Sequence, residues 1–289
     1  MNKLKDILFI YSLILIEFLI LSNTKIIYNS TLSSSKIFIL KIFPFMFPSM
    51  VIGNILTMIG LYKIIPNFIN KLFKYLFNFN MLDTSIFLTS IFTGSPSNAL
   101  FINECLNNNI IKEKEAENLL CVTNFINPLY IMGSIGLGIF NSYKIGLLLI
   151  LLLIISNLFK AYLLRNNFSK KILINNNNIS YINIIFKSIK TAINSSLMIF
   201  GIIIMFNILL SLINNVFNLS LISDCILNLT IEITSGIVKL SSLNINNIYK
   251  FILAYYFINF SGLCIHMQVL SQFKNKKIRY LKYLIFRLF

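Results

Sequence analysis

The stretch IGLLLILLLIISNLFKAYLL, residues 145–164, decides the class of this protein. Lys160 is its only charged residue, and it contains no Pro. A helix needs about 20 predominantly apolar residues to cross a hydrocarbon core of about 30 Å. The stretch therefore predicts a transmembrane helix.

The composition of the whole chain agrees with this prediction. Of its 289 residues, 57% are hydrophobic and 12% are charged, whereas a soluble domain is about 45–50% apolar and about 25% charged. This excludes a soluble globular domain. The net charge of +16 does not predict nucleic-acid binding, because Lys and Arg cluster at the ends of the apolar stretches, where they orient a membrane protein.

Six stretches are long and apolar enough to span a bilayer. They are residues 7–21, 37–62, 119–140, 145–164, 195–217 and 251–270. The first resembles a signal peptide, but a polar run and no small-x-small cleavage site follows it, so we interpret it as an uncleaved signal-anchor helix. Pro44 and Pro48 predict a kink or break near the start of the second. The amphipathic stretch 66–80 predicts a helix in the membrane interface.

Two further apolar stretches, 84–93 and 221–233, are too short to span. Segments of about 10–14 apolar residues are typical of re-entrant structure. The first ends at Gly94-Ser95-Pro96-Ser97-Asn98-Ala99, and the second at Thr234-Ser235-Gly236. We expect two hairpins that enter the bilayer and return on the same side.

The distribution of Lys and Arg predicts the orientation. With the N-terminus inside, most of the 25 basic residues fall on the cytoplasmic side, as the positive-inside rule requires. The basic residues left outside are Lys25, Lys36, Lys41, Lys144, Lys239 and Lys250. We therefore expect both termini and the Asn-rich linker 165–180 to face the cytoplasm.

The two halves of the chain resemble each other. Phe125-Ile126-Asn127-Pro128 recurs as Phe257-Ile258-Asn259-Phe260, and each copy follows a long span and a short hairpin. With the topology above the repeats are inverted, as in many secondary transporters that hold a site near the bilayer midplane. We predict an all-α polytopic membrane protein of about six transmembrane helices plus two re-entrant hairpins in inverted repeats.

This organisation divides the chain into five parts. They are a signal-anchor helix and loop (1–35), a first repeat (36–140), a connecting helix and polar linker (141–180), a second, inverted repeat (181–272) and a basic amphipathic tail at the membrane surface (273–289).

The hairpin tips hold the candidate binding residues. Gly94 and Pro96 force a turn, and Ser95 or Ser97 can cap the helix that follows. Free N–H groups at a helix start are suited to an anion or a polar ring; the alternative is a simple surface loop. The predicted substrate-binding residues are Gly94, Ser95, Pro96, Ser97, Asn98, Asn124, Asn127, Glu232, Thr234, Ser235, Gly236 and Asn259.

Several of these residues have a second interpretation. Asn124, Asn127 and Asn259 either bind substrate or hold helices together by hydrogen bonds. Glu232, an ionisable residue at membrane depth, either binds substrate or carries a coupling proton. His266 and Gln268 on the last span are more typical of hydrogen-bonded helix contacts.

Enzymatic and cofactor motifs are missing from the sequence. There is no G-x-S-x-G, no H-E-x-x-H and no phosphate-binding G-x-x-x-x-G-K-[ST] loop. Cys105, Cys121, Cys225 and Cys264 stand far apart, and the chain has one His, so the usual metal spacings cannot be built. We expect no enzymatic activity, no metal and no cofactor.

Three motifs carry a resemblance to a known family. They are Phe43-Pro44-Phe45-Met46-Phe47-Pro48-Ser49, the loop Gly94 to Ala99, and Asn124-Phe125-Ile126-Asn127-Pro128-Leu129-Tyr130-Ile131-Met132-Gly133. In order and spacing they resemble the nucleoside-recognition, or Gate, domain family, and within it the sporulation integral membrane proteins of the YlbJ type. The likeness is good over residues 36–140 and thin after residue 164; Asn98 departs from it, standing where a small residue is expected.

The resemblance implies a membrane protein of endospore formers, in the outer forespore membrane, linked to moving dipicolinate from the mother cell towards the forespore. We therefore expect a secondary transporter of a small polar or anionic metabolite, most specifically dipicolinate. The alternatives are a nucleoside-type carrier and a non-transporting scaffold for spore assembly. The implied partners are the solute, the lipid bilayer, and further copies of the chain or other sporulation membrane proteins.

Overall fold

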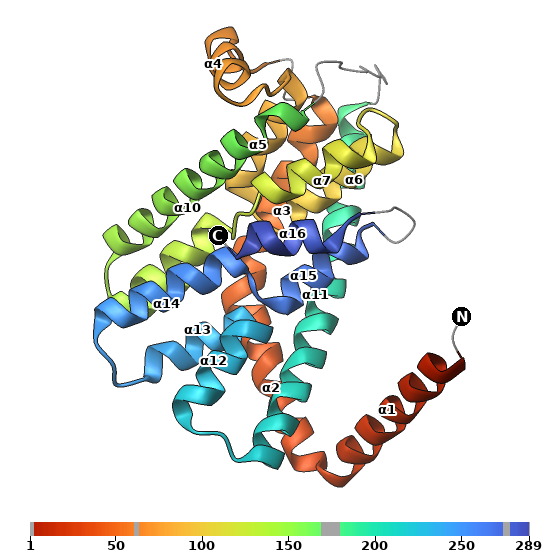
Figure 1. Ribbon diagram of the computed structural model, residues 1–289, viewed down its shortest axis with the longest axis vertical. Coiled ribbons are helices and arrows are strands. Elements are labelled where there is room, and N and C mark those ends of the chain that lie inside the picture. The colour runs from red at the N-terminus through yellow and green to blue at the C-terminus, as the bar shows by residue number, and fades with distance from the viewer. Residues whose placement is uncertain (1–2, 61–63, 169–179, 274–277, 289) are drawn as a thin grey trace.

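The computed structural model describes residues 3–60, 64–168, 180–273 and 278–288, and its regular elements there are all helices (Figure 1). Four helical stretches in these ranges are long and apolar enough to cross a membrane: Thr24–Ile59, Tyr143–Leu163, Tyr181–Phe217 and Asn247–Ser271. The shortest has 21 residues, about 31 Å at 1.5 Å per residue. The prediction of an all-α, multi-pass membrane protein is confirmed.

The predicted span 37–62 is the second part of a longer helical stretch. α2 (Thr24–Ile37), the π-helix η1 (Phe38–Ile42) and α3 (Phe43–Ile59) form one run of 36 residues. The helix is not broken at Pro44 or Pro48, because it continues through both; a kink near these prolines stays a prediction. Proline donates no backbone hydrogen bond, and η1, where the hydrogen bonding changes register, lies directly before Pro44.

The predicted first span is α1 (Lys3–Ser22), which lies apart from the helical body in Figure 1. It carries Lys5, Asp6 and Glu17 within 20 residues and is not one of the four long apolar stretches. Its apolar side chains project outward, with Phe9 and Phe18 about two-thirds exposed. Only a lipid environment or another protein surface covers such a helix favourably.

The predicted span 119–140 is two shorter helical pieces. α7 (Glu113–Val122) ends at Val122, residues 123–127 are non-helical, and α8 (Pro128–Tyr130), η3 (Ile131–Leu137, a π-helix) and α9 (Gly138–Phe140) follow without a gap. Asn127 starts the second piece, because its side-chain oxygen accepts hydrogen bonds from the N–H groups of Leu129 and Tyr130. Pro128 at the first helical position favours the same start.

The predicted span 251–270 is also interrupted, although more gently. α14 (Asn247–Phe260) ends at Ser261, whose φ of 71° lies in the left-handed region, and α15 (Gly262–Ser271) continues beyond it. Asn124 joins the two interruptions, because its amide donates to the Asn259 carbonyl and its side-chain oxygen accepts from Ser261 Oγ at 3.0 Å. The two interrupted stretches therefore meet at their breaks.

Each predicted hairpin is a pair of short helices. α5 (Met81–Thr93) and α6 (Ser97–Asn107) form the first, and α12 (Leu221–Ile231) and α13 (Ile233–Ser242) form the second. The second turn is at Glu232 alone, so Thr234, Ser235 and Gly236 lie in the first turn of α13 and not in a loop. A Cβ on Gly236 would come within 2.5 Å of the Leu229 nitrogen, so glycine permits the close contact of α12 with α13.

The long helices form the frame around the hairpins. α11 (Tyr181–Phe217), which includes the predicted span 195–217, packs along α2 and α3, and α10 (Tyr143–Leu163) packs against η3. The short 3-10 turn η4 (Arg165–Asn167) follows α10; residues 169–179 of the predicted linker lie outside the described ranges.

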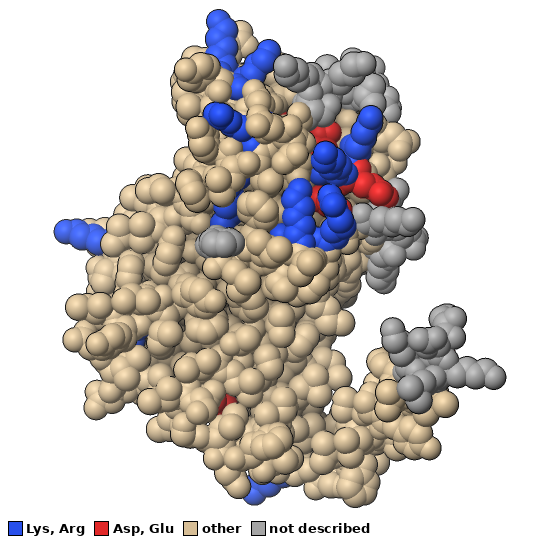
Figure 2. Space-filling model, viewed as in Figure 1, with Lys and Arg blue, Asp and Glu red and all other residues tan. Residues whose placement is uncertain are grey.

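Lys and Arg gather at the end of the molecule that carries α4 (Asn67–Phe77), α7 and α16 (Tyr280–Arg287), as Figure 2 shows. α4 is the amphipathic helix predicted for 66–80, with Phe68 and Tyr75 largely exposed. α16 in the tail packs on α7 and buries Tyr283 and Arg287; the location of the tail on the membrane surface stays a prediction. A cytoplasmic location for this end of the molecule stays a prediction.

Candidate functional site

The first hairpin tip presents hydroxyl groups that have no partner. The Ser95 N–H donates to the Phe125 carbonyl at 2.6 Å, which fixes the tip against the break between α7 and α8. The hydroxyls of Ser95 and Ser97 are buried and form no hydrogen bond to the described residues. Most buried polar groups are hydrogen-bonded, so these hydroxyls are positioned for a water molecule or a ligand.

Gly94 allows this tip to approach the break so closely. Its φ is +71°, and a Cβ at that position would come within 2.6 Å of the Asn127 nitrogen. Any other residue would meet both a strained backbone and an overlap with the neighbouring chain. Gly94 therefore acts through backbone geometry, and it does not line a cavity.

The second tip carries its own anion. Glu232 is 2% exposed, and its carboxylate accepts hydrogen bonds from the N–H groups of Thr234 at 3.1 Å and Ser235 at 2.7 Å. It also accepts one from Thr234 Oγ1 at 2.6 Å. The sequence predicts free N–H groups at this helix start; in the structure the Glu232 carboxylate occupies the N-terminus of α13.

A small cavity, here called the tip cavity, lies between the two tips. Its volume is about 60 Å³, and its lining includes residues of both hairpins and of the last span. The polar or tip residues in that lining are Ser95, Pro96, Asn127, Tyr130, Glu232, Thr234 and Gln268. A water molecule occupies about 30 Å³ in the liquid, so the cavity has room for about two waters and not for a metabolite.

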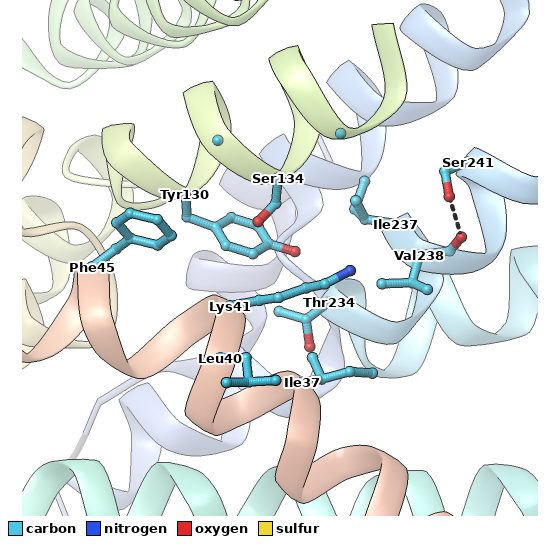
Figure 3. A pocket seen from close by; sticks show the side chains of 12 residues that line it. Ile37, Leu40, Lys41, Phe45, Tyr130, Ser134, Thr234, Ile237, Val238 and Ser241 are labelled. Atoms are coloured by element: carbon cyan, nitrogen blue, oxygen red, sulfur yellow. Dashed lines mark hydrogen bonds between the residues drawn. The ribbon is translucent and has the colours of Figure 1, made fainter. Parts of the chain in front are cut away.

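A larger cavity, here called the Lys41 cavity, has a volume of about 270 Å³ (Figure 3). Tyr130 and Thr234 line both cavities. Figure 3 shows the Lys41 side chain extending between Tyr130 and Thr234, with Ser134 beside Tyr130. Lys41 forms no ion pair or hydrogen bond with the described residues, so its ammonium group is available to an anion in this cavity.

Asn127 holds the wall of the tip cavity in place. Its side-chain oxygen caps α8, and its amide donates to Ser49 Oγ at 2.6 Å and to the Phe45 carbonyl at 3.3 Å. Both polar atoms of the side-chain amide, Oδ1 and Nδ2, are therefore used within the protein. This geometry favours the structural interpretation of Asn127, at a position that still lines the cavity.

Four of the predicted site residues lie in packed interfaces and do not line either cavity. Asn98 donates to Thr123, Asn124 joins the two breaks, and Ser235 Oγ donates to Asn228 Oδ1 at 3.1 Å. The Asn259 amide oxygen accepts from Ser156 Oγ at 3.1 Å. Of the predicted polar residues, Ser95, Asn127, Glu232 and Thr234 line the tip cavity.

Sequence reasoning missed Lys41, Tyr130 and Ser134 as site residues. The orientation count treats Lys41 only as a basic residue outside the membrane, although it lies between the apolar residues Leu40 and Ile42 within a long helical stretch. Gln268 lines the tip cavity, whereas His266 binds the Phe260 carbonyl and the Tyr280 hydroxyl. For each of these residues, the feature of the sequence that could have indicated a site is a polar side chain within an apolar stretch.

Within the described residues there is no group of three His, Cys, Asp or Glu side chains that could hold a metal ion. The four cysteines are buried and unpaired.

Comparison with known proteins gives one distant, partial similarity. Over 108 residues the chain is 25% identical to the sporulation integral membrane protein YlbJ of Bacillus subtilis (strain 168). The matched segment covers 37% of this chain and 26% of that relative. No protein-family model matches the chain, and no solved structure matches it.

Proposed function

We propose that this protein is a secondary transporter of a small anionic metabolite, which binds in the Lys41 cavity and passes the tip cavity. The observation that carries the proposal is the unpaired Lys41 ammonium in a cavity that shares Tyr130 and Thr234 with the space between the two hairpins. Intramembrane polar residues that converge on a cavity are typical of transport pathways.

In this proposal Lys41 binds the anion, a role that the sequence analysis assigns to the helix N-termini. Because Glu232 already occupies the start of α13, a second anion would be repelled there. The ammonium group of Lys41 and the hydroxyls of Tyr130 and Ser134 are the donors that remain in the larger cavity. A hydrogen bond to a charged group contributes about 1.5–3 kcal/mol, so Lys41 supplies the largest single contribution to binding an anion.

The two cavities differ in size, so we assign them different roles in transport. The Lys41 cavity, at about 270 Å³, lies just below the range of about 300–1,000 Å³ common for small-molecule sites. The tip cavity is too small for the same solute. The solute therefore waits in the Lys41 cavity until the tips separate, and the tip cavity is the closed part of the path.

We further propose that α5–α6 and α12–α13 are re-entrant hairpins of two inverted repeats, with both chain termini in the cytoplasm. Residues of both tips in one cavity lining support this arrangement, as does the meeting of the two interrupted stretches at Asn124 and Ser261. In such transporters irregular backbone at membrane depth surrounds the substrate path.

The proposed substrate is dipicolinate, a planar dianion, moved from the mother cell towards the forespore across the outer forespore membrane. The similarity to a protein named for sporulation supports this context. A nucleoside-type carrier on the same scaffold and a non-transporting scaffold for spore assembly are the competing functions.

Uptake by proteoliposomes tests the proposal. Vesicles that contain the full chain should accumulate labelled dipicolinate faster than empty vesicles, and unlabelled dipicolinate inside should accelerate the exchange. Uptake of uridine in place of dipicolinate would favour the nucleoside carrier. Uptake of neither solute would favour the scaffold.

A further inference from the structure

Two buried cations lie where the interrupted stretches meet. Lys160 of α10 and Arg287 of α16 are each 1% exposed. Neither forms an ion pair with the described residues, whose ion pairs join Lys239 to Asp224 and Arg279 to Glu117. Buried charges in proteins are normally paired or neutralised, so this arrangement requires an explanation.

A chain of hydrogen bonds connects the two cations. Lys160 Nζ donates to Asn259 Oδ1 at 3.5 Å, and Asn124 links the Asn259 backbone to Ser261 Oγ. Arg287 Nη1 donates to Ser261 Oγ at 3.1 Å. The two positive charges are close enough to repel each other, and no carboxylate is among the groups that act on either one.

One edge of the Arg287 guanidinium has no acceptor. Nη1 is used by Ser261, whereas Nε and Nη2 are buried and make no hydrogen bond to the described residues. The ring of Tyr283 covers the face of the group, with Cζ 4.5 Å from the ring centroid. Nε and Nη2 lie side by side on the guanidinium, and this pair of N–H groups matches the two oxygens of a carboxylate or phosphate.

Other buried polar atoms in the same place also lack partners. Asn157, whose amide donates to the Asn124 carbonyl at 2.7 Å, has an unpartnered Oδ1. Burial lowers the pKa of Arg287, and the neighbouring Tyr283 acts in the opposite direction. Arginine stays protonated in proteins under ordinary conditions, so the missing partner is a negative charge.

We propose that Arg287 and Lys160 together bind an oxyanion, with two of its oxygens on Arg287 Nε and Nη2. The ligand is a carboxylate or phosphate group, either free in solution or in the headgroup of an anionic lipid. This site lines neither the Lys41 cavity nor the tip cavity, and the inference does not depend on the proposed transport function.

The test measures thermal unfolding of the full chain in nanodiscs of neutral phosphatidylcholine at constant ionic strength. A ligand that binds the folded state raises its stability in proportion to ln(1 + [L]/Kd). Inorganic phosphate or acetate should therefore give a saturable rise of Tm. If only replacement of phosphatidylcholine by phosphatidylglycerol raises Tm, the oxyanion comes from the lipid headgroup, which also supports the site.

Five substitutions at four positions locate the effect. Arg287→Gln and Lys160→Gln should each remove the saturable rise, and Arg287→Lys should weaken binding at least about tenfold because the ammonium lacks the paired N–H groups. Arg279→Gln, at the residue directly before α16, and Lys282→Gln within α16 should keep it, since both lie at more exposed positions than Arg287.

Two results would overturn the proposal. One is a wild-type protein whose Tm responds to neither phosphate, acetate nor phosphatidylglycerol. The other is an equal loss of response in Arg279→Gln. The first result is measured on the wild-type chain, so it contradicts the proposal even if the Arg287 and Lys160 variants fold poorly.

Discussion

Tyr130 and Thr234 line both the Lys41 cavity and the tip cavity, although they come from different halves of the chain. Thr234 Oγ1 is held by Glu232, whereas the Tyr130 hydroxyl forms no hydrogen bond to the described residues and faces the cavity in Figure 3. Tyr130 is therefore the better placed of the two to contact a solute.

The first prediction concerns that hydroxyl. Tyr130→Phe removes one donor and keeps the ring, so we expect the affinity for dipicolinate to fall by about 0.5–1.5 kcal/mol, or about 2- to 12-fold. The KM of uptake measures the change. Tyr143→Phe, at an exposed position of α10, is the control. Equal KM values for wild type and Tyr130→Phe would exclude the phenol from the site.

The second prediction concerns the cap at the second tip. Glu232→Ala removes the acceptor for two backbone N–H groups of α13 and for Thr234 Oγ1. Loss of an N-cap lowers the free energy of unfolding by about 0.5–2 kcal/mol. The freed N–H donors are buried, so we expect a loss of stability at the upper end of this range. Thermal unfolding in nanodiscs measures it.

The control for this prediction is Ser220→Ala. Ser220 caps α12 in the same hairpin, through one exposed hydrogen bond from the Ser223 N–H. We expect a smaller loss of stability for this variant. If Glu232→Ala unfolds at the same temperature as wild type, the carboxylate does not hold the start of α13.

The third prediction concerns close packing in the same hairpin. Gly236→Ala places a Cβ within 2.5 Å of the Leu229 nitrogen, and such overpacking costs about 1–3 kcal/mol. Gly201→Ala in α11 meets nothing within 4 Å, so it should be neutral or stabilise the helix by up to about 1 kcal/mol. Equal unfolding temperatures for the two variants would contradict the packing of α12 on α13.

The fourth prediction concerns topology. All four native cysteines are buried, so a membrane-impermeant thiol reagent should find little background in the wild-type chain. With cytoplasmic termini, external reagent should label a cysteine at Asn244, between α13 and α14, and should miss one at Lys74 on α4. The reverse pattern would invert the proposed orientation.

The sequence predicts that long apolar helices are present, because a run of about 20 apolar residues is typical of a membrane span. Residues 145–164 agree closely with α10, whereas 37–62 and 195–217 are parts of longer helical stretches. It fails where one side chain decides between a continuous and a broken helix. Pro44 and Pro48 are accommodated beside a π-helical turn, whereas Asn127 and Pro128 start a new helix. At the second site Asn127 also donates a hydrogen bond to Ser49 Oγ. Such a tertiary contact cannot be read from the local sequence pattern.

The sequence places Ser95 and Thr234 at the two hairpin tips, and both line the tip cavity. Binding of a substrate by these residues stays a prediction. The sequence does not reveal that Glu232 turns back onto its own helix, or that Lys41 and Tyr130, 89 positions apart by their numbering, share a cavity. Such relationships depend on how η1, α8 and α13 pack, which periodicity does not specify.

The most direct test of the account is the initial rate of dipicolinate uptake by proteoliposomes that contain Lys41→Gln. Loss of a charge-assisted hydrogen bond of about 1.5–3 kcal/mol predicts a fall of about 10- to 150-fold in the rate at low substrate concentration. Lys36 lies five residues earlier on the same helical stretch and is exposed like Lys41, but it lines neither cavity, so Lys36→Gln should transport like wild type. Wild-type uptake by Lys41→Gln, or an equal defect in both variants, would contradict binding of an anion in the Lys41 cavity.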